Sequence, residues 1–166
     1  MKKNLKQFCL LTGLASGAIY GINKLIDTTS GIHKLLNETT GYFFEWRYGN
    51  IFYTKHGAGS PLLLIHDLYP ASSSYEWNRM IKKLEKEHTV YTIDLLGCGR
   101  SDKPNLTYTN YMYVQLVTDF VKKVIKEKTD VIATGESVSF TLMAANMDET
   151  IFNRLFFISP PSLESI

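Results

Sequence analysis

The sequence predicts an α/β fold in which a mostly parallel sheet, preceded by an antiparallel hairpin, is covered by helices in a three-layer arrangement. Two observations support this prediction. From residue 61 onward, short apolar runs typical of buried strands alternate with amphipathic segments at helical spacing, and such alternation produces right-handed crossovers between parallel strands. Before them, two aromatic-rich runs are joined at Gly49-Asn50, a pair typical of hairpin turns.

The composition is that of one globular domain. Hydrophobic residues make up 45% of the 166 residues and charged residues 20%, which argues against a disordered chain. The formal net charge of +2 is too small to indicate a nucleic-acid partner. Cys9 and Cys98 form neither a disulfide framework nor a metal-ligand pattern, so we expect no metal and no cofactor.

Residues 1–26 form a basic and apolar leader. Lysines at its start precede an uncharged span over 7–23, at the lower edge of the roughly 17–25 residues that cross a bilayer. We therefore expect a membrane anchor or an uncleaved signal, and a membrane-associated protein whose N-terminal end lies in the cytoplasm. Cleavage near residues 15–17, or a helix packed on the surface of a cytoplasmic protein, are the alternatives. A polar connector over 27–41 leads to the folded domain, 42–166.

The first elements of that domain are three strands and a helix. The hairpin strands cover 42–48 and 51–54. Residues 61–66 form a continuous apolar run, as in a strand buried on both faces. Ser73 and Glu76 have the spacing of a capping box, which predicts that a helix begins there.

The second half of the domain repeats this alternation. A strand over 89–93 ends at Asp94, and a loop follows it. Valines at helical spacing then predict an amphipathic helix; they are Val114, Val117, Val121 and Val124. The remaining elements are a strand over 130–134, a helix over 138–147 and a sixth strand over 155–158.

Ser137 stands between a predicted buried strand and a predicted helix. A serine on a sharp strand-to-helix turn is held with its hydroxyl exposed above the sheet. The helix N-terminus directs its amides toward a developing oxyanion. This context makes Ser137 the candidate nucleophile and the Val138 amide a candidate oxyanion donor. Taken as an isolated pattern, however, Gly-x-Ser-x-Ser more often marks a serine that only caps the following helix.

Four segments, in order, resemble the front half of the α/β-hydrolase superfamily, from Tyr42 to about Ser162. They are residues 61–66 with the following loop, 93–104, 135–139 and 155–161. The most specific is the second, Asp-x-x-Gly-x-Gly-x-Ser-x-x-Pro after a strand. The resemblance implies a serine hydrolase of the esterase or lipase type, which forms an acyl-enzyme on Ser137 from a small ester-like or acyl substrate.

The resemblance also assigns His66, Asp67 and Leu68 to the oxyanion loop, where the Leu68 amide is the second candidate donor. The loop commonly reads His-Gly in this superfamily, and Asp67 replaces that glycine. A carboxylate beside a developing negative charge opposes stabilisation unless it points away or is paired. Ser139 is a second departure, because the usual pattern has glycine two residues after the nucleophile.

The catalytic triad of this fold runs Ser, then an acid, then His along the chain. No histidine follows Ser137, and Glu164 is the candidate acid because it follows the sixth strand. The resemblance implies that further strands, a lid and the catalytic histidine lie beyond Ile166. We therefore expect a fragment, truncated after about the sixth strand, that has little activity by itself.

The sequence also bears on three other functions. Aspartate-nucleophile chemistry, as in epoxide or haloalkane hydrolysis, is disfavoured because the turn holds a serine. A non-catalytic scaffold or binding protein is the main alternative, because Asp67, Ser139 and the absent histidine all weaken acyl transfer. Nucleotide binding by Gly97 to Ser101 is disfavoured because the third glycine and the later acid of that motif are missing.

Overall fold

The structure of the chain is a computed structural model, and it describes residues 12–13, 15–25 and 40–162. The chain divides into two compact units, residues 1–38 and 39–166. In the first unit, residues 15–25 are helical. No helix within the described residues is both long and apolar enough to span a bilayer. Most of the predicted connector, and residues 7–11 of the predicted anchor, lie outside the described residues.

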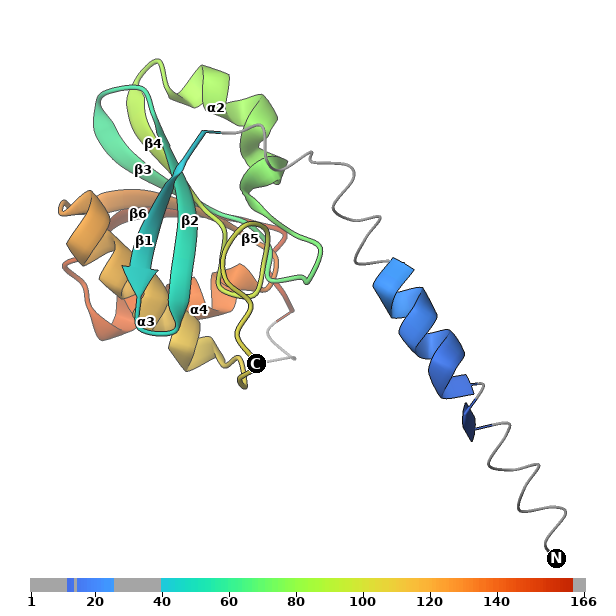
Figure 1. The fold of residues 1–166 in the computed structure, drawn as a ribbon. Coiled ribbons are helices and arrows are strands. Elements are labelled where there is room, and N and C mark those ends of the chain that lie inside the picture. The colour runs from blue at the N-terminus through green and yellow to red at the C-terminus, as the bar shows by residue number, and fades with distance from the viewer. Residues whose placement is uncertain (1–11, 14, 26–39, 163–166) are drawn as a thin grey trace, which may run out of the picture. The chain divides into compact units, whose positions relative to one another are not determined.

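The second unit is built on a six-stranded sheet (Figure 1). Its strands are β1 (Tyr42–Trp46), β2 (Gly49–His56), β3 (Ser60–Ile65), β4 (His88–Ile93), β5 (Thr129–Thr134) and β6 (Phe152–Ile158). They lie in the order β1-β2-β4-β3-β5-β6. The pairs β1–β2 and β2–β4 are antiparallel, and β3 pairs in parallel with both β4 and β5. The mostly parallel sheet with an antiparallel N-terminal hairpin is therefore confirmed.

Helices cover both faces of the sheet (Figure 1). The first face carries the short 3₁₀ helix η1 (Ser74–Trp77) and α2 (Asn78–Leu84). There Trp77 packs in a small core cluster with apolar side chains of β3 and β4. The other face carries α3 (Asn110–Phe120), its π-helical extension η2 (Val121–Ile125) and α4 (Ser137–Met147), whose buried side chains belong to the larger core cluster.

The hairpin turn differs from the sequence prediction. Trp46 is opposite Gly49 in the β1–β2 register, so the turn consists of Arg47 and Tyr48, and Gly49 already belongs to β2. The glycine serves a different purpose. Its φ is +147°, and a Cβ built on it would lie 2.7 Å from the Asp102 Cβ, so a larger residue would displace the loop after β4.

The predicted capping box is only half formed. The Ser73 hydroxyl accepts a hydrogen bond from the Tyr75 amide at 3.4 Å, as an N-cap residue does. The Glu76 carboxylate does not reach back to Ser73. It accepts a hydrogen bond from the Thr134 hydroxyl at 2.8 Å instead, which joins η1 to the end of β5.

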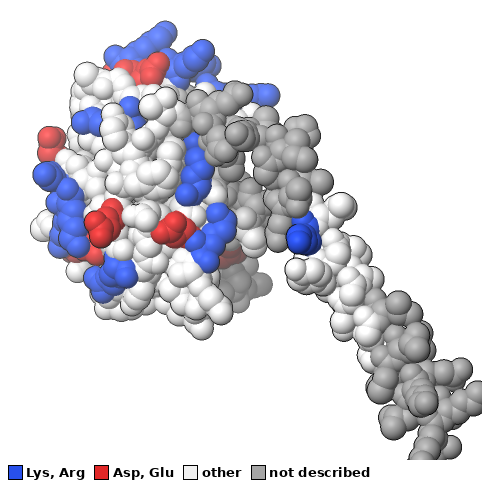
Figure 2. Space-filling model, viewed as in Figure 1, with Lys and Arg blue, Asp and Glu red and all other residues white. Residues whose placement is uncertain are grey.

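Strand β6 lies at an edge of the sheet, and within the described residues it pairs only with β5. Phe156 and Ile158 on this strand are 48% and 43% exposed. Figure 2 shows that charged side chains of both signs are scattered over the visible face of the folded unit.

Candidate functional site

The loops that follow β3, β4 and β5 meet at the carboxyl edge of the sheet. The chain places β4 on one side of β3 and β5 on the other. In open α/β sheets, ligands bind outside the carboxyl ends of the strands where the strand order reverses in this way. This edge is therefore the candidate functional site, and the sequence-predicted residues His66, Asp67, Leu68 and Ser137 all lie at it.

His66, directly after β3, is a structural histidine. Its side chain is fully buried, and its Nε2 accepts a hydrogen bond from the Leu95 amide at 3.0 Å. Because Nε2 is the acceptor, Nδ1 carries the proton and donates to the Asp67 carbonyl at 2.7 Å. Burial lowers the pKa of His66, so the ring is neutral. It ties the β3 loop to the β4 loop and is not available as a catalytic base.

The turn between β5 and α4 is shaped by Gly135, whose φ is +55°. A Cβ built on Gly135 would lie 2.2 Å from Oδ1 of Asp67. The Asp67 carboxylate thus occupies the space into which a side chain at position 135 would project. Its Oδ1 also accepts a hydrogen bond from the Glu136 amide at 2.9 Å, the first amide after the positive-φ residue.

Ser137 does not present its hydroxyl above the sheet, in contrast to the expected geometry. It is the first residue of α4 and is fully buried. Its Oγ donates to the His66 carbonyl oxygen at 2.5 Å. The physical reason is the position of the sharp turn, which lies two residues earlier at Gly135. The helix has already begun at Ser137, and its hydroxyl is bonded to the loop after β3.

The predicted oxyanion donors differ in their hydrogen bonding. The Val138 amide donates to the Gly135 carbonyl at 3.2 Å, so the turn itself uses it. The Leu68 amide has no hydrogen-bond partner in the part of the chain that the structure describes. The amide that binds the Asp67 carboxylate is that of Glu136, which the sequence did not indicate. Glu164, the candidate acid, lies outside the described residues.

Glu76 is a site residue that sequence reasoning missed, because it was assigned to the capping box. The Asp67 amide also hydrogen-bonds to its carboxylate. Burial raises the pKa of Glu76, and the hydrogen bonds from Thr134 and from the Asp67 amide offset that effect only in part. The replacement of glycine by Asp67 in the loop was the available signal that this edge is unusual.

A hollow of about 450 Å³ opens beside these two carboxylates. It is lined by Asp67, Glu76, Trp77, Met80, Thr134, Gly135, Ile158 and Ser159. None of these described lining residues carries a positive charge. The hollow therefore combines two acidic groups with the apolar side chains of Trp77, Met80 and Ile158.

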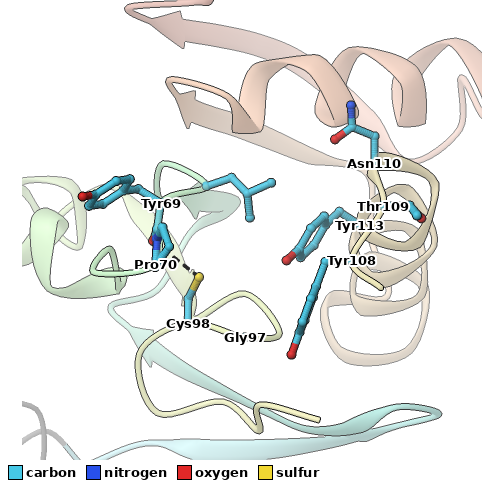
Figure 3. A pocket seen from close by; sticks show the side chains of 9 residues that line it. Tyr69, Pro70, Gly97, Cys98, Tyr108, Thr109, Asn110 and Tyr113 are labelled. Carbon is cyan, nitrogen blue, oxygen red and sulfur yellow. Dashed lines mark hydrogen bonds between the residues drawn. The ribbon is translucent and has the colours of Figure 1, made fainter. Parts of the chain in front are cut away.

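A second pocket, of about 300 Å³, has Leu68 in its lining (Figure 3). Tyr69, Pro70 and Cys98 line one side of it, and Tyr108 and Tyr113 line the opposite side. The Cys98 thiol donates to the Tyr69 carbonyl at 3.6 Å, and burial raises its pKa. The lining is thus aromatic with an unionised thiol, which suits an uncharged organic ligand.

The loop after β4 is held by Asp94, whose side chain is fully buried. Oδ1 accepts a hydrogen bond from the Ser74 amide at 2.7 Å, and Oδ2 accepts from the Arg100 amide at 2.8 Å and its Nε at 3.1 Å. Burial alone would raise the pKa of Asp94, but the hydrogen bonds from Ser74 and Arg100 outweigh it and hold the pKa below its ordinary value. Among the described residues, no three His, Cys, Asp or Glu side chains form a group that could hold a metal ion.

Comparison with known proteins identifies relatives of this architecture. The model of the alpha/beta hydrolase family matches residues 56–163. A crystal structure of an alpha/beta hydrolase fold protein from Burkholderia ambifaria superimposes with a TM-score of 0.68 at 25% identity, covering 74% of this chain and 44% of that one.

Two curated relatives carry names of enzymes. The soluble epoxide hydrolase of Corynebacterium sp. (strain C12) is 34% identical over 108 residues, which cover 64% of this chain and 36% of the relative. The haloalkane dehalogenase of Agrobacterium fabrum is 34% identical over 55 residues, covering 33% of this chain and 17% of the relative. The chain spans about a third of the length of the first curated relatives that it matches.

Proposed function

Because this chain belongs to the alpha/beta hydrolase family, we propose that it binds a small organic molecule at the carboxyl edge of its sheet and does not transfer acyl groups through Ser137. The observation that carries the proposal is the fully buried Ser137 hydroxyl, bonded to the His66 carbonyl. A serine nucleophile needs access to a carbonyl carbon and a base that takes its proton. A backbone carbonyl oxygen accepts a hydrogen bond but is not such a base.

The position of Asp67 supports the same proposal. Acyl transfer requires amides directed at the oxygen on which negative charge develops. The Glu136 amide already binds the Asp67 carboxylate at 2.9 Å. A carboxylate at that place would repel an oxyanion. Binding of an uncharged ligand in the adjoining pockets meets no such opposition.

Acyl transfer from an ester-like substrate through Ser137 is the second candidate. Its position favours it, because Ser137 directly follows the β5–α4 turn, as predicted for the nucleophile. For Ser137 to act, α4 would have to unwind by part of a turn and release the hydroxyl from His66.

A fluorophosphonate probe and a short nitrophenyl ester separate the two candidates. We expect equal, background labelling and ester hydrolysis for the 166-residue chain and for its Ser137→Ala variant. Labelling that disappears in Ser137→Ala would establish the second candidate. Binding is measured with 4-nitroacetanilide, an uncharged nitroaromatic amide, through quenching of tryptophan emission. Saturable quenching is expected, and its absence would contradict the binding role.

Membrane association through residues 7–23 is proposed on the sequence pattern alone. A reporter fused to residues 1–30 tests it by cell fractionation. We expect the reporter in the membrane fraction, and its recovery entirely in the soluble fraction would contradict the proposal.

A further inference from the structure

We propose that Asp67 is a carboxylate nucleophile toward small uncharged alkyl electrophiles such as epoxides, and that Glu76 donates the proton to the opening epoxide oxygen. This inference rests on the proposed ligand-binding role of the carboxyl edge and adds a reaction to it. The sequence had disfavoured aspartate chemistry because the turn after β5 holds a serine. The structure removes that reason, since the Ser137 hydroxyl is fully buried and bonded to the His66 carbonyl.

The geometry places the Asp67 carboxylate where a nucleophile would stand. Gly135 is the residue of the turn with positive φ, and its missing side chain would point at Asp67. The strand-to-helix turn of this fold displays its nucleophile from such a sharp, strained position. Here the residue at the sharp turn, Gly135, has no side chain, and the Asp67 carboxylate from the loop after β3 occupies that space.

The hydrogen bonding of Asp67 leaves one oxygen available to react. Oδ1 is fixed by the Glu136 amide at 2.9 Å, while Oδ2 has no hydrogen-bond partner among the described residues. None of the ion pairs within that same part of the chain involves Asp67. A carboxylate held by one oxygen keeps its orientation and presents the lone pairs of the other, as nucleophilic catalysis requires.

Glu76 lies in the same hollow and is suited to supply a proton. Its Oε1 accepts from the Thr134 hydroxyl at 2.8 Å, and the Asp67 amide also donates to its carboxylate. Burial raises the pKa of Glu76, and the negative charge of Asp67 acts in the same direction. These effects favour the protonated form of Glu76, which is the form that a general acid needs.

Asp67 supplies the electron pair for the chemical step, and Glu76 supplies the proton. Oδ2 of Asp67 forms a bond to an epoxide carbon, and the carbon–oxygen bond of the ring breaks with its electron pair on the oxygen. That oxygen takes the proton of Glu76. The products are a hydroxyalkyl ester of Asp67 and the Glu76 carboxylate. With an alkyl iodide the carbon–iodine bond breaks instead, iodide leaves with the electron pair, and no proton is needed.

Two similar proteins are named for substrates of this kind, an epoxide hydrolase and a haloalkane dehalogenase. Trp77, Met80 and Ile158 give the hollow apolar walls that suit such uncharged molecules. The nitrophenyl ether of glycidol is therefore a suitable probe, with an epoxide and an aromatic group.

The first experiment is alkylation of the 166-residue chain by 4-nitrophenyl glycidyl ether, followed by intact mass and peptide mapping. We expect one adduct on Asp67, absent from Asp67→Asn and retained in Glu149→Gln, a variant of an exposed carboxylate. Circular dichroism checks that Asp67→Asn is folded. No adduct on Asp67, or adducts only on cysteines or on exposed acids, would overturn the proposal.

The second experiment tests Glu76 and does not depend on Asp67→Asn folding. In Glu76→Gln we expect about a hundredfold slower epoxide adduct formation, in the range of general acid catalysis. The rate with the matched iodide, 1-iodo-3-(4-nitrophenoxy)propane, should be unchanged. Equal slowing of both probes, or of neither, would refute the acid role. Saturable 4-nitroacetanilide quenching without any Asp67 adduct would overturn this inference and leave the proposed binding function standing.

Discussion

Two aspartates follow neighbouring parallel strands, and the fold holds them in opposite ways. Asp94, after β4, is fully buried and both of its oxygens accept hydrogen bonds, with the Arg100 side chain as ion-pair partner. Asp67, after β3, is half-buried, and only its Oδ1 is bonded. The first carboxylate fastens a loop to the sheet. The second is positioned but keeps an oxygen for a ligand.

The comparison teaches that burial and hydrogen-bond saturation separate a structural carboxylate from a candidate reactive one. Both residues lie at the same edge of the sheet, so location alone does not distinguish them. Asp94 has no lone pair left for a substrate, whereas Asp67 lines an open hollow. The following changes test this distinction, beginning with the largest expected effect.

Replacing Asp94 by Ala should destabilise the folded unit most. The change leaves the Arg100 side chain without its buried ion-pair partner and the Ser74 amide without its acceptor. Removing one partner of such a buried pair costs about 3–5 kcal/mol. Urea denaturation followed by circular dichroism measures it. A loss below 1 kcal/mol would show that the loop is held by other contacts.

The pH dependence of a second variant of the same residue, Asp94→Asn, gives an independent check. Because the folded-state pKa of Asp94 lies below its ordinary value, its contribution is complete above about pH 4 and is lost as the pH falls through the lowered pKa. The difference in urea midpoint between the parent chain and Asp94→Asn should therefore shrink between pH 7 and pH 3. A constant difference would contradict the shift.

Replacing Gly135 by Ala should have an intermediate effect. The substitution forces an alanine to a φ of +55° and places its Cβ 2.2 Å from the Asp67 carboxylate oxygen, which together cost about 1–3 kcal/mol. Adding Asp67→Gly removes the clash, so the double variant should recover part of the loss. A double-mutant cycle measures this coupling, and strictly additive effects would separate Asp67 from the turn.

Replacing Asp67 by Asn should have the smallest effect on stability. The Asn side chain keeps an acceptor for the Glu136 amide, and no buried cation loses its partner. We expect a change within about 1 kcal/mol, the net value of one hydrogen bond. Urea denaturation under the conditions used for Asp94→Ala gives a direct comparison. A loss as large as that of Asp94→Ala would make Asp67 a structural residue like Asp94.

The sequence predicted the sheet well because its strands are short apolar runs bounded by turn residues, a local signal. The valine face of α3 and its extension η2 is another example, since Val114, Val117 and Val121 are buried as expected. The predicted hairpin turn was wrong by two residues, because Gly49 pairs with Trp46 inside the hairpin. The glycine is needed there for its close approach to Asp102, which is distant in sequence.

The site was harder to predict because its contacts join separate loops. Ser137 has the sequence neighbours expected of a nucleophile, yet the local sequence does not reveal at which residue the backbone turns sharply. The role of Glu76 was missed because a local capping pattern competed with a bond to Thr134, 58 residues away. Asp67 was the one residue whose departure from the superfamily pattern indicated an unusual site.

The open edge of β6 has a consequence for the life of this chain in a cell. Exposed Phe156 and Ile158 accompany backbone groups on the side of β6 that pairs with no strand among the described residues, the combination that templates strand addition between molecules. Such a surface is also what chaperones and proteases select. In the cell, the described edge should therefore be a site where copies of the folded unit pair with one another or are captured.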